Sequence, residues 1–156
     1  QLNFYPANTQ REGVKYSPVW HDPQGSLDFL KADLADKVGD SGRPVVLMAH
    51  CGFDTDWWTK EDWRDFYDAA KGFNVVLYLY GHSGTSVGTW SPEGEPPVWN
   101  IINDGQTEKG FFVIRITGDR LRAAMRIRSR PDPAKKEAAP EWEWKWLLDK
   151  PIAPIR

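Results

Sequence analysis

Two short apolar runs, each followed by a histidine, constrain the fold of this chain more than any other feature. Val75–Tyr80 leads into His82, and Val45–Met48 leads into His50. Both runs are rich in β-branched or aromatic residues and are bounded by Gly or Pro, which predicts buried strands. In α/β sheets, ligands bind in the crevice outside the carboxyl ends of the strands. The sequence therefore predicts that His50 and His82 lie together in a metal or phosphate site.

The segments around these strands alternate between helix and strand patterns. Apolar residues recur at helical spacing from Ser26 onward, and Gly39 or Gly42 is expected to end this first helix. Thr59 and Asp62 resemble a capping box ahead of a second helix with an apolar face. Because parallel strands need a crossover helix, this order predicts an α/β fold with a partly parallel sheet.

Outside these segments the chain is predicted to consist mostly of strands and turns. The expected strands cover residues 2–5, 86–90, 98–102, 110–116 and 121–128. Short turns between the later strands imply antiparallel pairing. A linker rich in Pro and Ala follows, and the alternation of Trp142, Trp144 and Trp146 predicts one more half-buried strand. The expected organisation is a domain at 1–130, a linker at 131–140 and a Trp-rich terminal strand or tail at 141–156.

Length and charge limit the partners that we expect for this chain. Its 156 residues suit one domain, and its net charge of -2 gives no overall attraction to nucleic acid or to anionic membranes. No apolar run approaches the ~18 residues of a membrane-spanning helix. We therefore expect no nucleic-acid partner and no membrane span. The chain opens on Gln1, in a strand-like pattern, so we expect a fragment or a processed product whose cellular location the sequence leaves open.

The two histidine blocks resemble the last two signature blocks of the calcineurin-like metallophosphoesterases. VVLMAH ends at His50 and VVLYLYGHSG contains His82. In that family a strand ends in a lone metal-binding His, and a later strand ends in Gly-His-x-His. The flanking segments SLDFLKADL, NIINDG, GFFVIRIT and RLRAAMR resemble the family's neighbouring helix and closing antiparallel strands. The resemblance covers residues 1 to 128 and implies the C-terminal half of an α/β sandwich, with mixed parallel and antiparallel sheets and outer helices.

For the site, the resemblance implies metal-dependent hydrolysis of a phosphate mono- or diester. His50 and His82 would bind one of two divalent ions, and mixed imidazole and oxygen ligation suits Mn, Fe, Zn or Ni. Gly84 stands where the family has the histidine that binds the second metal. The second ion would then be completed by water or another side chain, be bound weakly, or be absent.

Other parts of the family's site are missing here. The blocks Asp-x-His, Gly-Asp and Gly-Asn-His-Asp/Glu do not occur, so no catalytic residue is assigned, and we expect these blocks upstream of Gln1 or on a separate chain. Gly81, Asn103 and Asp104 are expected beside the metal ligands without binding the metal directly. Two alternatives stay open: a non-catalytic remnant that serves as a binding module on the same scaffold, and one piece of a cleaved enzyme.

Several residues near the two blocks permit a functional and a structural interpretation. Trp57 and Trp58 either wall a substrate cleft or pack in the core. Asp54 and Asp56 are interpreted as turn residues rather than as ligands. His21 is interpreted as a solvated loop residue rather than as a substitute ligand.

An arginine-rich segment precedes the linker. Arg126, Arg128 and Arg130 alternate and so share one face of a predicted strand, and Glu141 and Glu143 are expected to lie opposite them. This pattern favours a salt-bridged, solvated face over a nucleic-acid-binding patch.

Overall fold

The computed structural model describes residues 26–50, 52, 60–82, 84–104, 110–128 and 142–153. The chain divides into two compact units, residues 1–106 with 153–156, and residues 107–152. The strand expected at 2–5 and the linker expected at 131–140 lie outside the described residues. The predicted division into 1–130, 131–140 and 141–156 stays a prediction.

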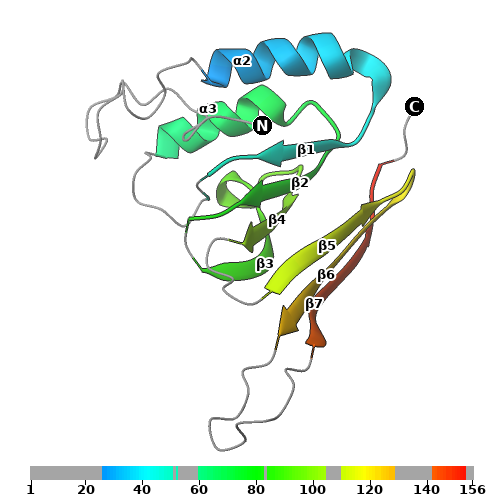
Figure 1. Cartoon of the computed structure of the whole chain (residues 1–156). Coiled ribbons are helices and arrows are strands. Elements are labelled where there is room, and N and C mark those ends of the chain that lie inside the picture. Colours follow the sequence, from blue (N-terminus) through cyan, green and yellow to red (C-terminus); the bar gives the residue numbers. More distant parts are fainter. Residues whose placement is uncertain are drawn as a thin grey trace, which may run out of the picture. The chain divides into compact units, whose positions relative to one another are not determined.

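The first unit contains a four-stranded mixed sheet. Its strands are β1 (Val45–Met48), β2 (Val75–Tyr80), β3 (Thr85–Trp90) and β4 (Trp99–Asp104), arranged in the order β1-β2-β4-β3 (Figure 1). β2 pairs in parallel with both β1 and β4, while β3 pairs antiparallel with β4. The predicted α/β class with mixed parallel and antiparallel sheets is confirmed.

Two helical segments match the two predicted helices. α2 (Ser26–Asp33) continues through a π-helical turn (Leu34–Val38) into a short 3-10 turn (Gly39–Ser41). This helical stretch ends where Gly39 and Gly42 adopt φ values of 46° and 66°, a region that glycine enters without steric cost. The second helix, α3 (Lys60–Ala70), carries the apolar face that the sequence predicts.

α2 and α3 share one hydrophobic core with one face of the sheet. Leu30 and Leu34 from the first helical segment join Phe66 from α3 and Tyr78 from β2 in this cluster. Aromatic side chains form much of this cluster. Among them, Trp99 lies 5.8 Å from Phe66, measured between ring centroids. The two helices therefore form one layer, which packs on one face of the sheet.

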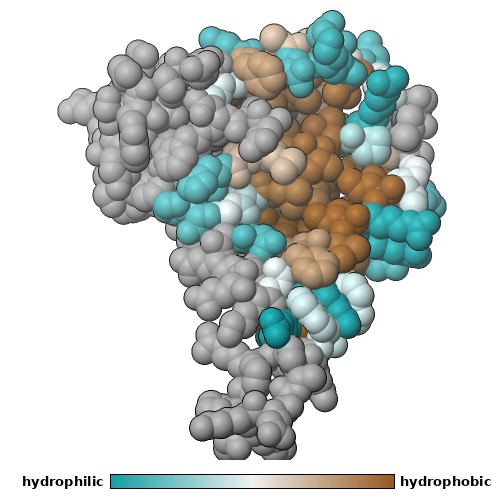
Figure 2. Space-filling view, in the orientation of Figure 1, coloured by the Kyte–Doolittle hydropathy of each residue, from teal (hydrophilic) through white to brown (hydrophobic). Residues whose placement is uncertain are grey.

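The opposite face of this sheet is also apolar. Leu77 and Ile102 are buried there, whereas Met48 is 44% exposed. Figure 2 shows hydrophobic residues gathered over the region of β1 and β2 that faces the viewer. Parallel strands that are hydrophobic on both sides are typical of sheets covered on both faces.

The second unit is a three-stranded antiparallel sheet. β5 (Gly110–Ile116), β6 (Arg120–Arg128) and β7 (Trp142–Pro151) are arranged in that order. These strands confirm the three predicted for this region. Ala123 pairs with Leu148 while Met125 pairs with Lys145, so β7 contains an extra residue that forms a bulge.

The pairing of β6 with β7 corrects the expected arrangement of charges. Glu143 lies opposite Ile127, and Arg126 lies opposite Trp144. The expected pairing of Glu143 with the arginines is therefore wrong, because the register places it on the other side of the sheet. Glu141 and Arg130 lie outside the described residues.

No helix in the described ranges is long and apolar enough to cross a membrane.

Candidate metal centre

The candidate metal centre lies at one edge of the four-stranded sheet. Because β1, β2 and β4 run parallel, their carboxyl ends meet at this edge. β1 leads to His50, β2 leads to His82, and β4 ends in Asn103 and Asp104. β3 starts at the same edge, where Thr85 pairs with Asp104.

The side chains of His50 and His82 are in direct contact. The Nε2 atom of His50 lies 2.9 Å from the Nδ1 atom of His82, although 32 residues separate them in the chain. Their ring centroids are 4.9 Å apart and the rings are inclined by 70°. The structure thus brings together the two histidines that the sequence predicts to be neighbours.

Backbone hydrogen bonds beyond the strands hold this pair in place. The amide of Ala49 donates to the carbonyl oxygen of Leu79 at 3.1 Å, and the amide of Gly81 donates to that of His50 at 3.0 Å. These bonds extend the β1–β2 ladder into the two turns that carry the imidazoles. The position of the pair is therefore set mainly by the sheet.

The turn around His82 has an unusual backbone. His82 has φ 75° and Gly84 has φ 57°. A residue with a side chain is uncommon at positive φ, and such conformations gather at functional sites. A Cβ added at Gly84 would lie 3.8 Å from Nδ2 of Asn103, so the buried Asn103 amide lies beside this turn.

Burial changes the ionisation of two groups at this edge. The pKa of His50 is lowered by partial burial and, to a smaller extent, by nearby His82. The pKa of the Asp104 carboxyl is raised by partial burial. The shift at His50 favours neutral imidazole, which is the form that binds metals.

The separation of the two nitrogens fits a shared metal ion. Imidazole nitrogens bind Zn²⁺ at about 2.0 to 2.1 Å, so two of them at tetrahedral or right angles would lie about 2.9 to 3.4 Å apart. The distance between His50 Nε2 and His82 Nδ1 falls at the lower end of this range. However, the described part of the chain contains no cluster of three or more His, Cys, Asp or Glu that could hold a metal ion. The donor set therefore fits half of a metal shell.

Four of the other predicted site residues lie near the histidine pair, and the rest fall outside the described residues. Gly81, Gly84, Asn103 and Asp104 all lie at or next to the sheet edge that carries the histidine pair. Trp57 and Trp58 fall outside the described residues, as do Asp54, Asp56 and His21.

Sequence reasoning missed the role of Gly52. A Cβ built on Gly52 would overlap the ring of Tyr80, so the chain just after His50 approaches β2 more closely than any other residue would allow. A glycine two residues after a histidine at the end of a strand indicates that the backbone approaches another segment closely. The sequence does not show that this segment is β2, because that depends on the fold.

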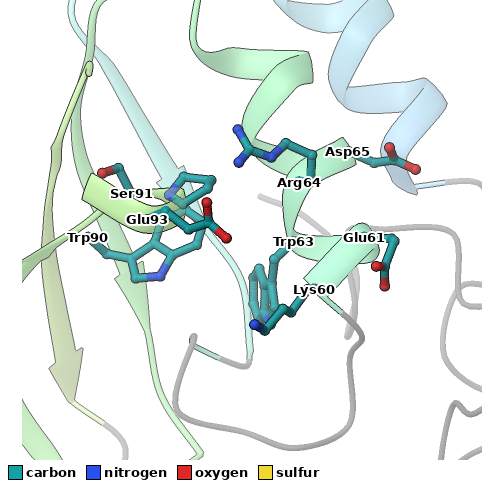
Figure 3. A pocket seen from close by; sticks show the side chains of 9 residues that line it. Lys60, Glu61, Trp63, Arg64, Asp65, Trp90, Ser91 and Glu93 are labelled. Atoms are coloured by element: carbon teal, nitrogen blue, oxygen red, sulfur yellow. The ribbon is translucent and has the colours of Figure 1, made fainter. Parts of the chain in front are cut away.

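A cavity of about 670 Å³ lies elsewhere in this unit, between α3 and the turn after β3 (Figure 3). Trp63 and Trp90 line it, with ring centroids 6.1 Å apart. Arg64 forms an ion pair with Glu95, which ties the turn to the helix. Neither histidine of the pair lines this cavity, so it is distinct from the candidate metal centre.

Comparison with protein-family models, curated proteins and solved structures gave no match.

Proposed function

We propose that this chain supplies part of a phosphoesterase metal site of the calcineurin-like type, in which His50 and His82 bind one divalent cation. The reaction would be hydrolysis of a phosphate mono- or diester. The observation that carries this proposal is the 2.9 Å approach of His50 Nε2 to His82 Nδ1 at the carboxyl edge of a parallel sheet.

The roles of the chain's own residues follow from the geometry of this edge. Bound divalent cations polarise a phosphoryl oxygen and lower the pKa of a bound water. His50 and His82 would each donate a nitrogen lone pair, and the lowered pKa of His50 favours neutral imidazole, the form that binds metals. Asn103 and Asp104 would shape the wall of the site, since β4 ends beside the same turn.

The second apolar face of the four-stranded sheet supports the sandwich part of the proposal. α2 and α3 pack on one face only, while Leu77 and Ile102 belong to the other. Leu77 and Ile102 are already buried, so a further sheet is needed only over the exposed part of that face, and a sheet packed there would complete the two-sheet architecture that the resemblance implies. The exposure of Met48 marks the part of this face that such a layer would cover.

A second candidate function is a binding module without catalysis. Gly84 offers no ligand for a second metal, and the His50–His82 pair supplies only two donors. A chain with this edge and no further ligands would bind one cation weakly or serve as a scaffold. The two candidates predict the same residues for metal binding but differ in turnover.

The test is titration of the purified chain with Mn²⁺ and Zn²⁺ by calorimetry, with metal content measured after dialysis. His50→Asn and His82→Asn remove one imidazole each, and Asn suits position 82 because it tolerates positive φ. His21→Asn is the matched control. We expect one bound ion for the chain and the control, and loss of binding in both variants. Equal binding by all four proteins would refute His50 and His82 as ligands.

Turnover separates the two candidate functions. Chromogenic phosphate mono- and diesters are assayed with each metal in the protein that retains binding. Hydrolysis that depends on both His50 and His82 supports the phosphoesterase. Because the family's other ligand blocks do not occur in this chain, the assay is also run on the full-length gene product, and metal binding there without hydrolysis supports the binding module.

A further inference from the structure

One face of the three-stranded sheet combines arginines with exposed aromatic rings. We call it the arginine–aromatic face. It includes Phe111, Arg122, Arg126, Arg128, Trp142 and Trp144. Phe111, Trp142 and Trp144 are 49%, 44% and 53% exposed. Rings exposed to this degree and gathered on one side of a sheet mark an interaction surface.

The register of the strands places these side chains on the same side of the sheet. Phe111 lies opposite Arg126, which lies opposite Trp144, and Arg128 lies opposite Trp142. Residues directly opposite one another in an antiparallel sheet project to the same side. The face therefore follows from strand pairing and does not depend on the conformation of any single side chain.

Arg126 lies at the centre of this face. Its guanidinium carbon is 4.9 Å from the ring centroid of Trp144 and 5.9 Å from that of Trp142. Phe111 and Trp142 meet edge to face at 5.9 Å. Stacking uses the flat side of a guanidinium and leaves its N–H groups, which lie in the plane, able to bind phosphate.

The charge of this region is opposite to that of the rest of the chain. Residues 107–152 contain eleven Lys or Arg against seven Asp or Glu, whereas the remaining residues contain nine against fifteen. At one end of the face, Asp149 pairs with Arg120 and Arg122. At the aromatic end, Glu143 lies opposite Ile127 and so projects away from Arg126. Positive charge therefore concentrates where the rings are exposed.

We propose that the arginine–aromatic face binds single-stranded nucleic acid. Such ligands offer flat bases that stack on aromatic rings and phosphates that pair with arginine, and proteins that bind them without sequence preference combine these two features. An acidic polysaccharide offers the charge without flat aromatic rings. The net charge of -2, which argues against a nucleic-acid partner for the whole chain, does not describe this face.

The test is fluorescence anisotropy with labelled oligo-dT and oligo-U of about twelve nucleotides, a length within the range that one such site covers. The two oligonucleotides distinguish DNA from RNA. Trp144→Ala removes a stacking ring and Arg126→Gln removes the central charge. Phe29→Ala, a half-exposed aromatic on α2, and Arg43→Gln, an exposed arginine outside the face, are the matched controls.

We expect binding of at least one oligonucleotide at low salt, weakened about 5- to 150-fold by Trp144→Ala. Arg126→Gln should weaken binding and reduce the slope of log affinity against log salt by about 0.7. Both controls should bind as the unchanged chain does, and so should His82→Asn, which separates this result from the metal proposal. Circular dichroism checks that each variant is folded.

Three outcomes would overturn the proposal. The first is absence of binding to both oligonucleotides at low salt. The second is binding that heparin abolishes and Trp144→Ala leaves unchanged, which would indicate a surface for acidic polysaccharide. The third is a dimer in solution that Trp144→Ala dissociates, without oligonucleotide binding, which would assign the face to self-association.

Discussion

The ring of Tyr80 occupies the space into which any side chain at position 52 would project, so the backbone of Gly52 packs directly against this ring on β2. Tyr80 is 7% exposed and stacks on Tyr78 with ring centroids 5.5 Å apart. The chain leaving His50 can therefore pass over β2 only because position 52 lacks a Cβ. This close contact lies two residues after His50.

Gly52→Ala is expected to destabilise the chain. The added methyl group must displace a packed tyrosine ring, and overpacking of this kind costs about 1 to 3 kcal/mol. Gly72→Ala is the control, because a Cβ there meets nothing within 4 Å. Urea denaturation of both variants measures the difference. Equal midpoints would show that the Tyr80 ring moves aside without cost.

Leu77→Ala and Met48→Ala compare two positions on the second apolar face of the sheet. Leu77 is fully buried and Met48 is 44% exposed. We expect Leu77→Ala to lower the free energy of unfolding by about 2 to 5 kcal/mol. Met48→Ala should cost less than about 1 kcal/mol, since a large part of its side chain is already exposed to water. A large effect of Met48→Ala would mean that Met48 contributes to packing as the buried part of this face does.

Tyr67→Phe tests the attachment of the turn after β3 to α3. The Tyr67 hydroxyl lies within hydrogen-bond distance of the carbonyl oxygens of Glu95 (3.2 Å) and Pro97 (3.1 Å). Loss of this buried hydroxyl should cost about 0.5 to 1.5 kcal/mol, measured by urea denaturation. An unchanged midpoint would contradict a stabilising role for this contact.

The ion pair of Glu95 with Arg64 predicts a pH dependence. Its hydrogen bond from Arg64 lowers the pKa of Glu95 below the usual 4.5. Between the folded pKa and 4.5 the unfolded chain binds more protons, so the pair stabilises the fold above that window and stops doing so as the pH falls through the folded pKa. Glu95→Gln should therefore lower Tm slightly at pH 7 and not at strongly acid pH.

Thermal melts across this pH range check that prediction. Asp40→Asn, which changes an exposed carboxylate on the turn after α2, is the control and should follow the unchanged chain at every pH. A constant difference in Tm between Glu95→Gln and the unchanged chain would assign the effect to packing rather than to charge.

Local sequence pattern was sufficient for the elements of the first unit. β1 and β2 have the bounds that their β-branched and aromatic runs predict, and α3 buries the face that its spacing predicts. The approach of His50 to His82 was also predictable, because both histidines follow parallel strands that pair directly. Their role as metal ligands stays a prediction.

Contacts that depend on register or on distant chain segments could not be predicted in this way. The contact of Arg126 with Trp144 requires the pairing of β6 with β7, and period-two alternation alone does not fix which residues face each other. The close contact of Gly52 with Tyr80 likewise joins two segments that are distant in the sequence, so a local sequence pattern does not predict it.

Because of the bulge in β7, the number of residues in this strand determines which side chains share a side of the sheet. Trp144 and Asp149 lie on the same side of the sheet only because one additional residue lies between them. The alternation of sides along β7 therefore shifts by one residue at the bulge. Shortening β7 by one residue within the bulge would move either the tryptophans or the partner of Arg122 to the reverse side. Among relatives of this chain, the number of residues between these two positions should therefore vary less than the residues themselves.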